Sequence, residues 1–183
     1  IQYILKEVVR VSGVEYKDGE AETDVSIRII TDHLRSMTFM IGDGITPGNE
    51  GREYVLRRLI RRAARHGRIL GIEGSFLSKL CGKVIDVSAG AYPELEKRRV
   101  MIQKVVTAEE DRFAATIDQG MKIINGYIDE LKQEGGIVLD GRKAFKLHDT
   151  YGFPIDLTRE ILEESGYAVD TEGFESAMAE QKD

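Results

Sequence analysis

The sequence predicts a mainly α-helical protein: a helical bundle domain with one small β-hairpin element near residues 137–148. Apolar residues recur every three or four positions through most of the 183 residues, and clusters of glycine or proline separate these periodic segments. Near residue 137 the helical period is lost, and a short run of Ile, Val and Leu precedes an Asp-Gly pair, which is typical of a hairpin turn.

The first part of the chain predicts three helices. Residues 1–12 form the first, which ends at Gly13. Asp24 can cap a second helix that extends to about residue 40. Residues 42–51 contain four glycines and one proline, so they cannot continue a helix. Residues 52–70 form the strongest helical pattern, with apolar residues on one side and arginines on the other.

The middle of the chain predicts one short and one long helix. Residues 76–87 form the short helix. Residues 94–133 keep the helical period throughout, so they predict one long helix in which Gly120 and Gly126 permit a kink. The glycine pair at 135–136 ends it.

The remaining segment predicts the hairpin and two further helices. Asp140-Gly141 is expected to form the two-residue turn of the hairpin. Pro154 stands just before a helix over residues 156–164, where its fixed φ angle is tolerated. Thr171 can cap a last helix that extends to residue 179.

The domain organisation follows from length and composition. Residues 1–183 are expected to form one helical domain, with sub-units at 1–135 and 136–183. The absence of an initiator Met suggests a fragment of a larger protein.

A single cysteine, Cys81, excludes an internal disulfide and fits a reducing, cytoplasmic location. No run of about 20 apolar residues occurs, so no membrane partner is expected.

Positive charge is concentrated in one predicted helix. The whole chain carries a net charge of −6, but residues 52–68 hold seven arginines and one glutamate. At about 100° per residue, six arginines share the face opposite the apolar stripe. These are Arg57, Arg58, Arg61, Arg62, Arg65 and Arg68. Because the planar guanidinium fork suits phosphate, this face predicts a polyanionic partner.

Two other interpretations of this face stay open. The arginines could form salt bridges with the acidic remainder of the chain, and Arg57 and Arg62, at the edges of the arc, are the expected structural ion pairs. Alternatively, the chain is a helical protein-interaction scaffold that docks an acidic partner on its arginine face.

No catalytic or metal-binding set is evident. His66 and His148 stand alone, without a carboxylate partner in the sequence pattern, and are expected to be structural. Asp149 and Asp156 have capping roles as their default, because one lies at a predicted turn and the other near a helix N-terminus. The residues alone therefore predict a binding module, with no catalytic residue and no metal ligand, rather than a stand-alone enzyme.

Two stretches together resemble the alanyl-tRNA synthetase family. They are TDHLRSMTFMIGDGITPGNEGREYVLRRLIRRAARHG, residues 31–67, and LHDTYGFPIDLTREI, residues 147–161. Both resemble signatures of the middle, tRNA-binding region of that family, and they occur in its order and at about its spacing. One departure is Glu53, where the family pattern NEGRGY has a glycine, and it affects only the expected packing of the loop.

The resemblance implies a helical tRNA-recognition domain from a larger synthetase. The family joins alanine to its tRNA through an alanyl-adenylate, using ATP and Mg²⁺ in an N-terminal class II catalytic domain, and binds zinc in an editing domain. The motifs of both domains are absent here, so this segment is expected to bind no cofactor. Its implied partners are the acceptor stem of tRNA and the catalytic and editing domains of the same polypeptide.

The resemblance also implies two residues that recognise a wobble G·U pair in the acceptor stem: Asn49, in GNEGR, and Asp149, in HDTYG. The minor groove of A-form RNA is wide and accessible, and a wobble pair leaves the guanine amino group free there. A carboxylate accepts a hydrogen bond from that group, whereas an Asn amide can both accept and donate. The two side chains are expected to flank one groove beside the arginine face, whose arginines bind phosphate.

Overall fold

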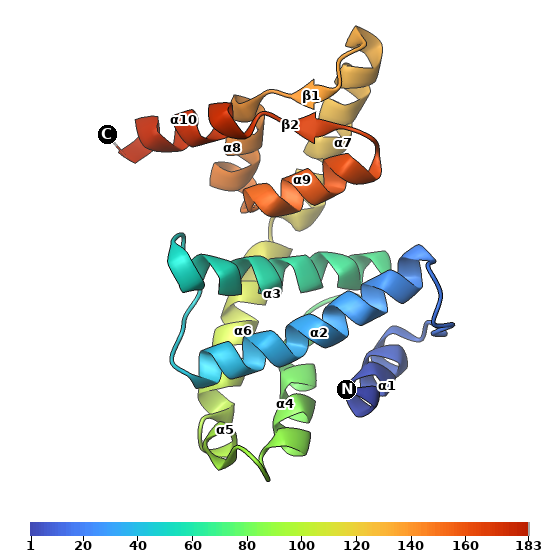
Figure 1. The fold of residues 1–183 in the computed structure, drawn as a ribbon, viewed down its shortest axis with the longest axis vertical. Helices are drawn as coiled ribbons and strands as arrows, with labels where there is room; N and C mark the ends of the chain where they lie inside the picture. The colour runs from blue at the N-terminus through green and yellow to red at the C-terminus, as the bar shows by residue number, and fades with distance from the viewer. Residues whose placement is uncertain (183) are drawn as a thin grey trace. The chain divides into compact units, whose positions relative to one another are not determined.

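The computed structural model describes residues 1–182 and divides the chain into two compact units, Ile1–Ala114 and Ala115–Asp183 (Figure 1). The first unit contains α1 (Gln2–Ser12), α2 (Glu22–Gly42), α3 (Gly51–Ile69), α4 (Leu77–Ser88), α5 (Pro93–Lys97) and α6 (Arg99–Ala114). The second contains α7 (Ile117–Glu134), β1 (Val138–Leu139), α8 (Gly141–Tyr151), α9 (Ile155–Glu164), β2 (Ala168–Val169) and α10 (Thr171–Lys182). The predicted mainly α-helical class is confirmed, while the division falls after residue 114 instead of residue 135.

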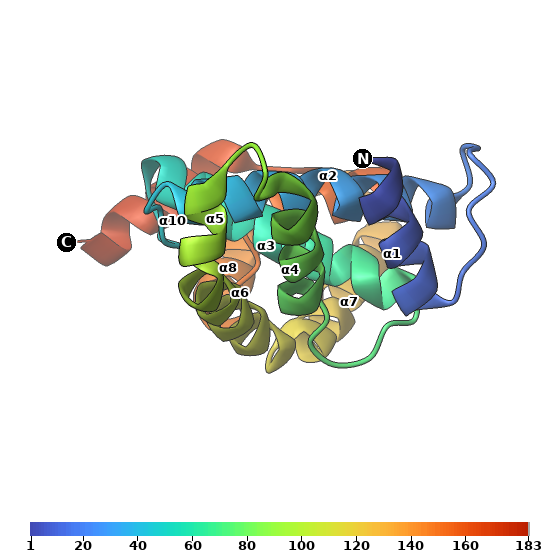
Figure 2. The same cartoon turned by 90° about the horizontal axis from the view of Figure 1, so that it is seen from below.

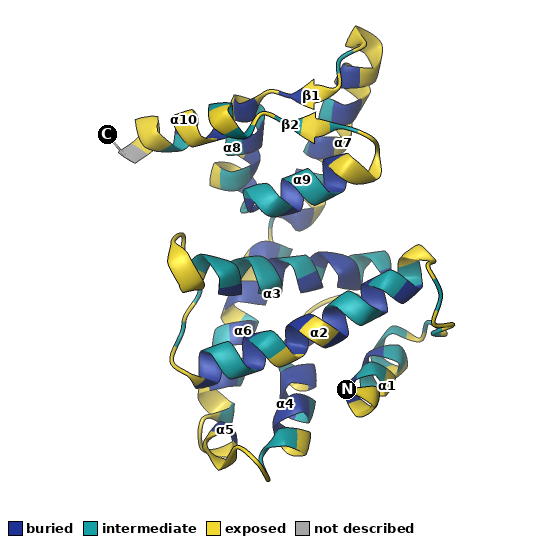
Figure 3. Cartoon of the chain, in the orientation of Figure 1, coloured by how far each residue is buried: buried dark blue, intermediate teal, exposed yellow. Residues whose placement is uncertain are grey.

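The core of the first unit forms between two layers of helices. Helices α2 and α3 lie side by side, and α4 and α6 pack against them (Figures 1 and 2). Apolar side chains at helical spacing on α2 and α3 are fully buried. Figure 3 marks the buried residues along both helices in dark blue. They include Ile27, Ile30, Leu34, Leu56 and Ile60. The helix predicted at residues 52–70 is thus confirmed as α3.

The segment between α1 and α2 corrects one predicted cap. Helix α1 ends at Gly13, whose φ of 70° is the left-handed conformation that glycine adopts without strain. Helix α2 begins two residues before Asp24, so Asp24 is not its N-cap. Its buried carboxylate instead accepts the backbone N–H groups of Lys17 and Gly19, at 2.9 and 3.0 Å, and so fixes the preceding loop.

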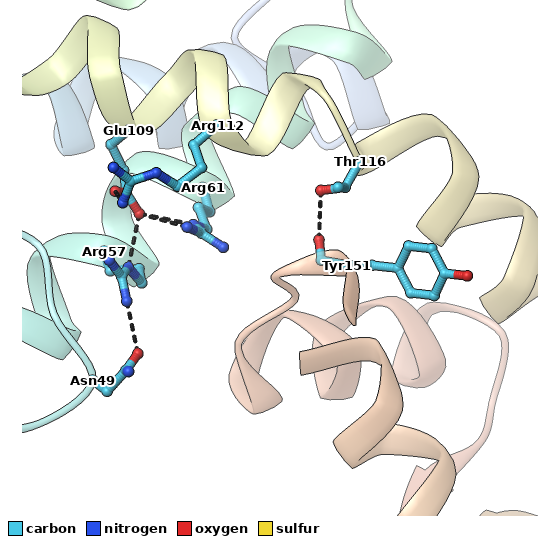
Figure 4. Close-up of polar contacts among 7 residues, drawn as sticks. All are labelled: Asn49, Arg57, Arg61, Glu109, Arg112, Thr116 and Tyr151. Atoms are coloured by element: carbon cyan, nitrogen blue, oxygen red, sulfur yellow. Dashed lines mark hydrogen bonds and ion pairs between the residues drawn. The ribbon is translucent and has the colours of Figure 1, made fainter. Parts of the chain in front are cut away.

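The long helix predicted over residues 94–133 is wrong, because the structure contains three helices there: α5, α6 and α7. The chain leaves the helical path at Ala115 and Thr116. The hydroxyl of Thr116 donates to the carbonyl of Tyr151 at 2.7 Å, and α7 begins at the next residue (Figure 4). Gly120 lies within α7 and provides space for the ring of Phe153, which an added Cβ would approach to 2.3 Å.

The β-hairpin predicted at 137–148 is also wrong. Strand β1 pairs in parallel with β2, with Val138 opposite Ala168, and no hairpin partner follows it. Asp140 is the N-cap of α8, since its carboxylate accepts the N–H of Arg142 at 2.9 Å. A Cβ on Gly141 would lie 2.3 Å from a backbone atom of α10. The Asp-Gly pair therefore marks a helix start at a tight helix contact, not a turn.

Helix α8 is the centre of the second unit, because α7, α9 and α10 all pack against it. Its buried residues Ala144, Leu147 and Tyr151 recur at three and four positions. The helices expected over residues 156–164 and 171–179 are confirmed as α9 and α10, with Pro154 as the N-cap of α9. The cap expected at Thr171 is wrong, because α10 begins at Thr171 and the carboxylate of Asp170 accepts the N–H of Gly173 at 3.0 Å.

Two glycines of α7 predict opposite effects of substitution by alanine. Gly120→Ala places a methyl group against the fully buried ring of Phe153, so overpacking of about 1–3 kcal/mol opposes the gain in helix propensity. Gly126 faces open space, so Gly126→Ala is expected to stabilise the protein by roughly 0.5–1 kcal/mol. Urea unfolding of both variants measures the difference; a Gly120→Ala protein as stable as Gly126→Ala would contradict the packing of α7.

A buried carboxylate holds the start of α4. Glu110, 3% exposed, accepts the backbone N–H groups of Phe76 and Leu77 at 3.0 and 3.1 Å. Burial raises the pKa of Glu110 to about 7, against the lowering effect of these two hydrogen bonds. The folded chain therefore binds a proton at Glu110 that the unfolded chain releases near its ordinary pKa of 4.5.

This raised pKa predicts that stability falls as pH rises. The contribution of Glu110 is fully present below about pH 4.5 and is lost through pH 7, a change of about 3 kcal/mol. We expect Glu110→Gln to flatten this part of the profile, because the amide carries no charge at any of these pH values. Urea unfolding between pH 4.5 and 8 measures it, with the exposed Glu94→Gln as the control that keeps the slope.

Candidate functional site

The six arginines of the α3 face differ in burial. Arg61 and Arg65 are each only 6% exposed, while Arg57, Arg58, Arg62 and Arg68 are half-buried. The apolar stripe opposite them, at Leu56, Ile60 and Ala63, is fully buried. The predicted amphipathic helix is confirmed, but two of its arginines belong to the interior and not to an open cationic face.

One carboxylate of α6 holds two of these arginines (Figure 4). Oε1 of Glu109, a residue only 3% exposed, accepts from Nε of Arg57 at 2.8 Å and from Nε and Nη2 of Arg61 at 2.9 and 2.8 Å. A third guanidinium approaches the other oxygen of this carboxylate, with Nη1 of Arg112 lying 3.9 Å from Oε2 of Glu109. The internal ion pair expected at Arg57 is thus confirmed, and the one at Arg61 was not predicted.

The guanidinium of Arg61 is held from a second side. It lies over the ring of Phe113, with its central carbon 5.3 Å from the ring centroid. Burial lowers the pKa of Arg61, and the charge of Glu109 opposes this effect. Arginine stays charged at physiological pH, so the interior retains this ion pair.

Arg62 contacts a histidine of α2. Its Nη1 lies 3.1 Å from Nε2 of His33, and Nδ1 of His33 lies 3.2 Å from the carboxylate of Asp32. Burial, followed by the charge of Arg62, lowers the pKa of His33. A neutral imidazole fits both contacts, because Nε2 then accepts from Arg62 while the N–H at Nδ1 donates to Asp32.

The two histidines expected to be structural lie in packed surroundings. His66 is 3% exposed, and its Nδ1 lies 2.8 Å from the hydroxyl of Ser26. The ring of His148 forms a cluster with the rings of Phe145 and Phe174, whose centroids lie 6.1 and 5.7 Å from it and 6.3 Å from each other.

Asn49 is exposed in the loop that leads into α3. Its Oδ1 accepts a hydrogen bond from Nη1 of Arg57 at 2.7 Å (Figure 4). Gly51, with a φ of 59°, starts α3 in a conformation that favours glycine. Glu53, the one departure from the family pattern, lies exposed in the first turn of α3, and its backbone carbonyl accepts the N–H of Gly48 in the loop at 3.0 Å.

Asp149 is exposed in the last turn of α8, between the buried Leu147 and Tyr151. The capping role expected for it is wrong, because the helix continues to Tyr151 and its carboxylate instead accepts from Nε2 of Gln181 in α10, at 2.9 Å. Asp156 lies in the first turn of α9 and pairs with Arg159 at 2.8 Å. Asn49 belongs to the first unit and Asp149 to the second, so their approach to one groove stays a prediction.

Sequence reasoning missed Glu109, although the chain carries a signal for it. On α6 the buried residues Ile102, Val106 and Phe113 define an apolar stripe at helical spacing. Glu109 falls within this stripe, three residues after Val106 and four before Phe113. A charged residue at a core position of one helix, opposite an arginine-rich helix, indicates an internal ion pair.

Neither a metal-ion cluster nor a membrane-spanning helix occurs among residues 1–182. Within that range, no group of three or more His, Cys, Asp or Glu side chains is arranged to hold a metal ion. The helices that the structure describes also include none that is both long and apolar enough to cross a membrane.

The helical fold, the arginine-lined α3 and the polar loop before it define a class: the chain belongs to the family tRNA synthetases class II (A), whose sequence model matches residues 1–183. The relatives are alanine–tRNA ligases. The chain is 55% identical over 183 residues to that of Clostridioides difficile, 54% over 182 residues to that of Acetivibrio thermocellus, and 51% over 183 residues to that of Natranaerobius thermophilus. Each alignment covers 100% of this chain and 21% of the relative. The predicted resemblance is confirmed.

Glu109 is expected to be a main stabilising residue of the first unit. Glu109→Gln leaves the buried guanidinium of Arg61 and the half-buried one of Arg57 without their shared counter-charge, and breaking a buried pair costs about 3–5 kcal/mol. The matched control is Glu96→Gln, which removes an exposed pair with Arg99 and is expected to cost less than about 1 kcal/mol. Urea unfolding compares the two; equal losses would show that the buried ion pair contributes no more than the exposed one.

Proposed function

We propose that the chain is the tRNA-recognition region of an alanine–tRNA ligase and binds the acceptor stem of alanine tRNA at a wobble G·U pair. Asn49 and Asp149 contact the base pair in this proposal. The observation that carries it is that both are exposed polar side chains within the two signatures, each on a well-defined element: the loop before α3 and the last turn of α8.

Base-pair selection follows from the donors and acceptors of these side chains. The guanine amino group of a G·U pair is free in the minor groove, and the carboxylate of Asp149 can only accept. In a G·C pair one N–H of this amino group bonds to cytosine, and the guanine is held in a different position in the groove. The carboxylate then stays poorly satisfied, at a cost on the order of 1–3 kcal/mol. The preference for G·U thus depends on two side chains.

The arginines of α3 have two roles in this proposal. The half-buried Arg58, Arg62 and Arg68 supply phosphate contacts, which position the stem without selecting a sequence. Arg61 and Arg65 are almost fully buried and act chiefly by supporting the helix. Because phosphate contacts release counterions, affinity is expected to fall with salt for G·U and G·C stems alike.

The chain spans 21% of the length of the alanine–tRNA ligases it matches, so the complete reaction is assigned to the longer enzyme. ATP and Mg²⁺ serve alanine activation in its catalytic domain, and zinc serves its editing domain. In this proposal the present chain contributes tRNA selection to a cytoplasmic synthetase and binds none of these cofactors itself.

The proposal predicts that two side chains determine selectivity. The test uses the full-length Clostridioides difficile enzyme with this chain replacing the aligned 183 residues. Its aminoacylation rate is compared on RNA hairpins that carry either G·U or G·C at the recognised pair. We expect Asn49→Ala and Asp149→Ala each to reduce the G·U preference roughly tenfold or more, because each leaves a desolvated partner unpaired.

The control for charge alone is Asp129→Ala, which removes an exposed aspartate of α7. It is expected to keep the preference. Retention of full G·U preference by both Asn49→Ala and Asp149→Ala would refute the assignment. An equal loss of activity on both hairpins, with the preference kept, would assign the two residues to general affinity instead.

A further inference from the structure

Two hydrogen bonds in series connect the amide of Asn49, through Arg57, to the buried carboxylate of Glu109. Nη1 of Arg57 donates to Oδ1 of Asn49 at 2.7 Å, and Nε of the same guanidinium donates to Oε1 of Glu109 at 2.8 Å (Figure 4). We propose that Arg57 is a positioning residue. Anchored on the buried Glu109, it fixes the amide so that the NH₂ group of Asn49 is offered to RNA. This inference rests on the proposed function.

The chemistry of the guanidinium fixes the orientation of the amide. A guanidinium has only donors, so the oxygen of Asn49, and not its nitrogen, must face Arg57. Turning the amide over would set the NH₂ group against another donor and lose the hydrogen bond. The exposed side of Asn49 therefore presents a hydrogen-bond donor.

This orientation narrows what Asn49 can recognise. A free Asn amide offers both a donor and an acceptor, and the sequence left both open. With its oxygen engaged by Arg57, the side chain suits an RNA acceptor such as uracil O2 or a ribose hydroxyl oxygen. The guanine amino group, a donor, then falls to the carboxylate of Asp149.

The anchor behind Arg57 is rigid. Glu109 is 3% exposed, and Arg61 bonds to the same Oε1 from within the interior. Arg61 is in turn held over the ring of Phe113. An exposed Asn side chain that is already held in this way loses little conformational freedom on binding. Less of the free energy of its hydrogen bond to RNA is therefore offset by lost entropy.

The experiment compares two neighbouring arginines in the full-length chimaera described above. Arg57→Met keeps the aliphatic stem and leaves Glu109 paired with Arg61. We expect the G·U over G·C preference to fall roughly tenfold. The matched control is Arg58→Met, which removes the same charge one residue along α3. It should lower activity on both hairpins by the same factor and leave the preference unchanged.

A second variant tests the donor without disturbing the anchor. Asn49→Asp keeps an oxygen for Arg57 but has no N–H, so it should lose the preference as fully as Asn49→Ala. The double variant Arg57→Met/Asn49→Ala should lose no more than Asn49→Ala alone, because Arg57 acts through the amide.

The outcomes separate this inference from the proposed function. A wild-type chimaera that does not prefer G·U refutes the proposed function. If the wild type prefers G·U and Asn49→Ala loses this preference, the inference is overturned by an Arg57→Met variant that keeps it. A double variant that loses clearly more than Asn49→Ala overturns it as well. Should Arg57→Met unfold, Asn49→Asp decides: retained preference overturns the donor assignment.

Discussion

The ion pair of Glu109 with Arg57 and Arg61 is the contact on which the arginine helix depends. A charged carboxylate that is 3% exposed is stable only when opposite charge and hydrogen bonds replace its water, and two guanidiniums supply both. The same contact joins α6 to α3 inside the first unit. Arg57 then extends it to Asn49 at the surface. The carboxylate of Glu109 thus contributes both to the stability of the first unit and to the orientation of a candidate RNA contact.

This sharing explains why six arginines on one helix are not six equivalent phosphate contacts. Helix α3 packs against both α2 and α6, so side chains beyond its apolar stripe are buried as well, among them Arg61 and Arg65. The long side chain of Arg61 becomes part of the interior where Glu109 and the ring of Phe113 meet it. The half-buried Arg58 and Arg68 retain an exposed part, where a phosphate can be met.

Local signals in the sequence were sufficient where one element determines its own structure. Gly13 ends α1 and the apolar stripe defines α3, because neither depends on a distant partner. Prediction failed where the deciding contact was remote. Thr116 leaves the helical path beside the carbonyl of Tyr151, and Asp140-Gly141 starts a helix against α10 instead of turning a hairpin. Neither residues 94–133 nor residues 137–148 contain these partners, so the hydrophobic pattern of those segments could not reveal the contacts.

The site shows the same limit. The signatures made Asn49 and Asp149 candidate RNA contacts, but the direction of a hydrogen bond depends on the neighbour of each side chain. For Asp149 that neighbour is the amide of Gln181, which donates to it at 2.9 Å. The guanine amino group is a donor of the same type, so binding RNA would exchange one N–H donor for another at this oxygen. Such an exchange avoids the full desolvation of a charged acceptor, and for this reason a carboxylate can select a free amino group without a large loss of affinity.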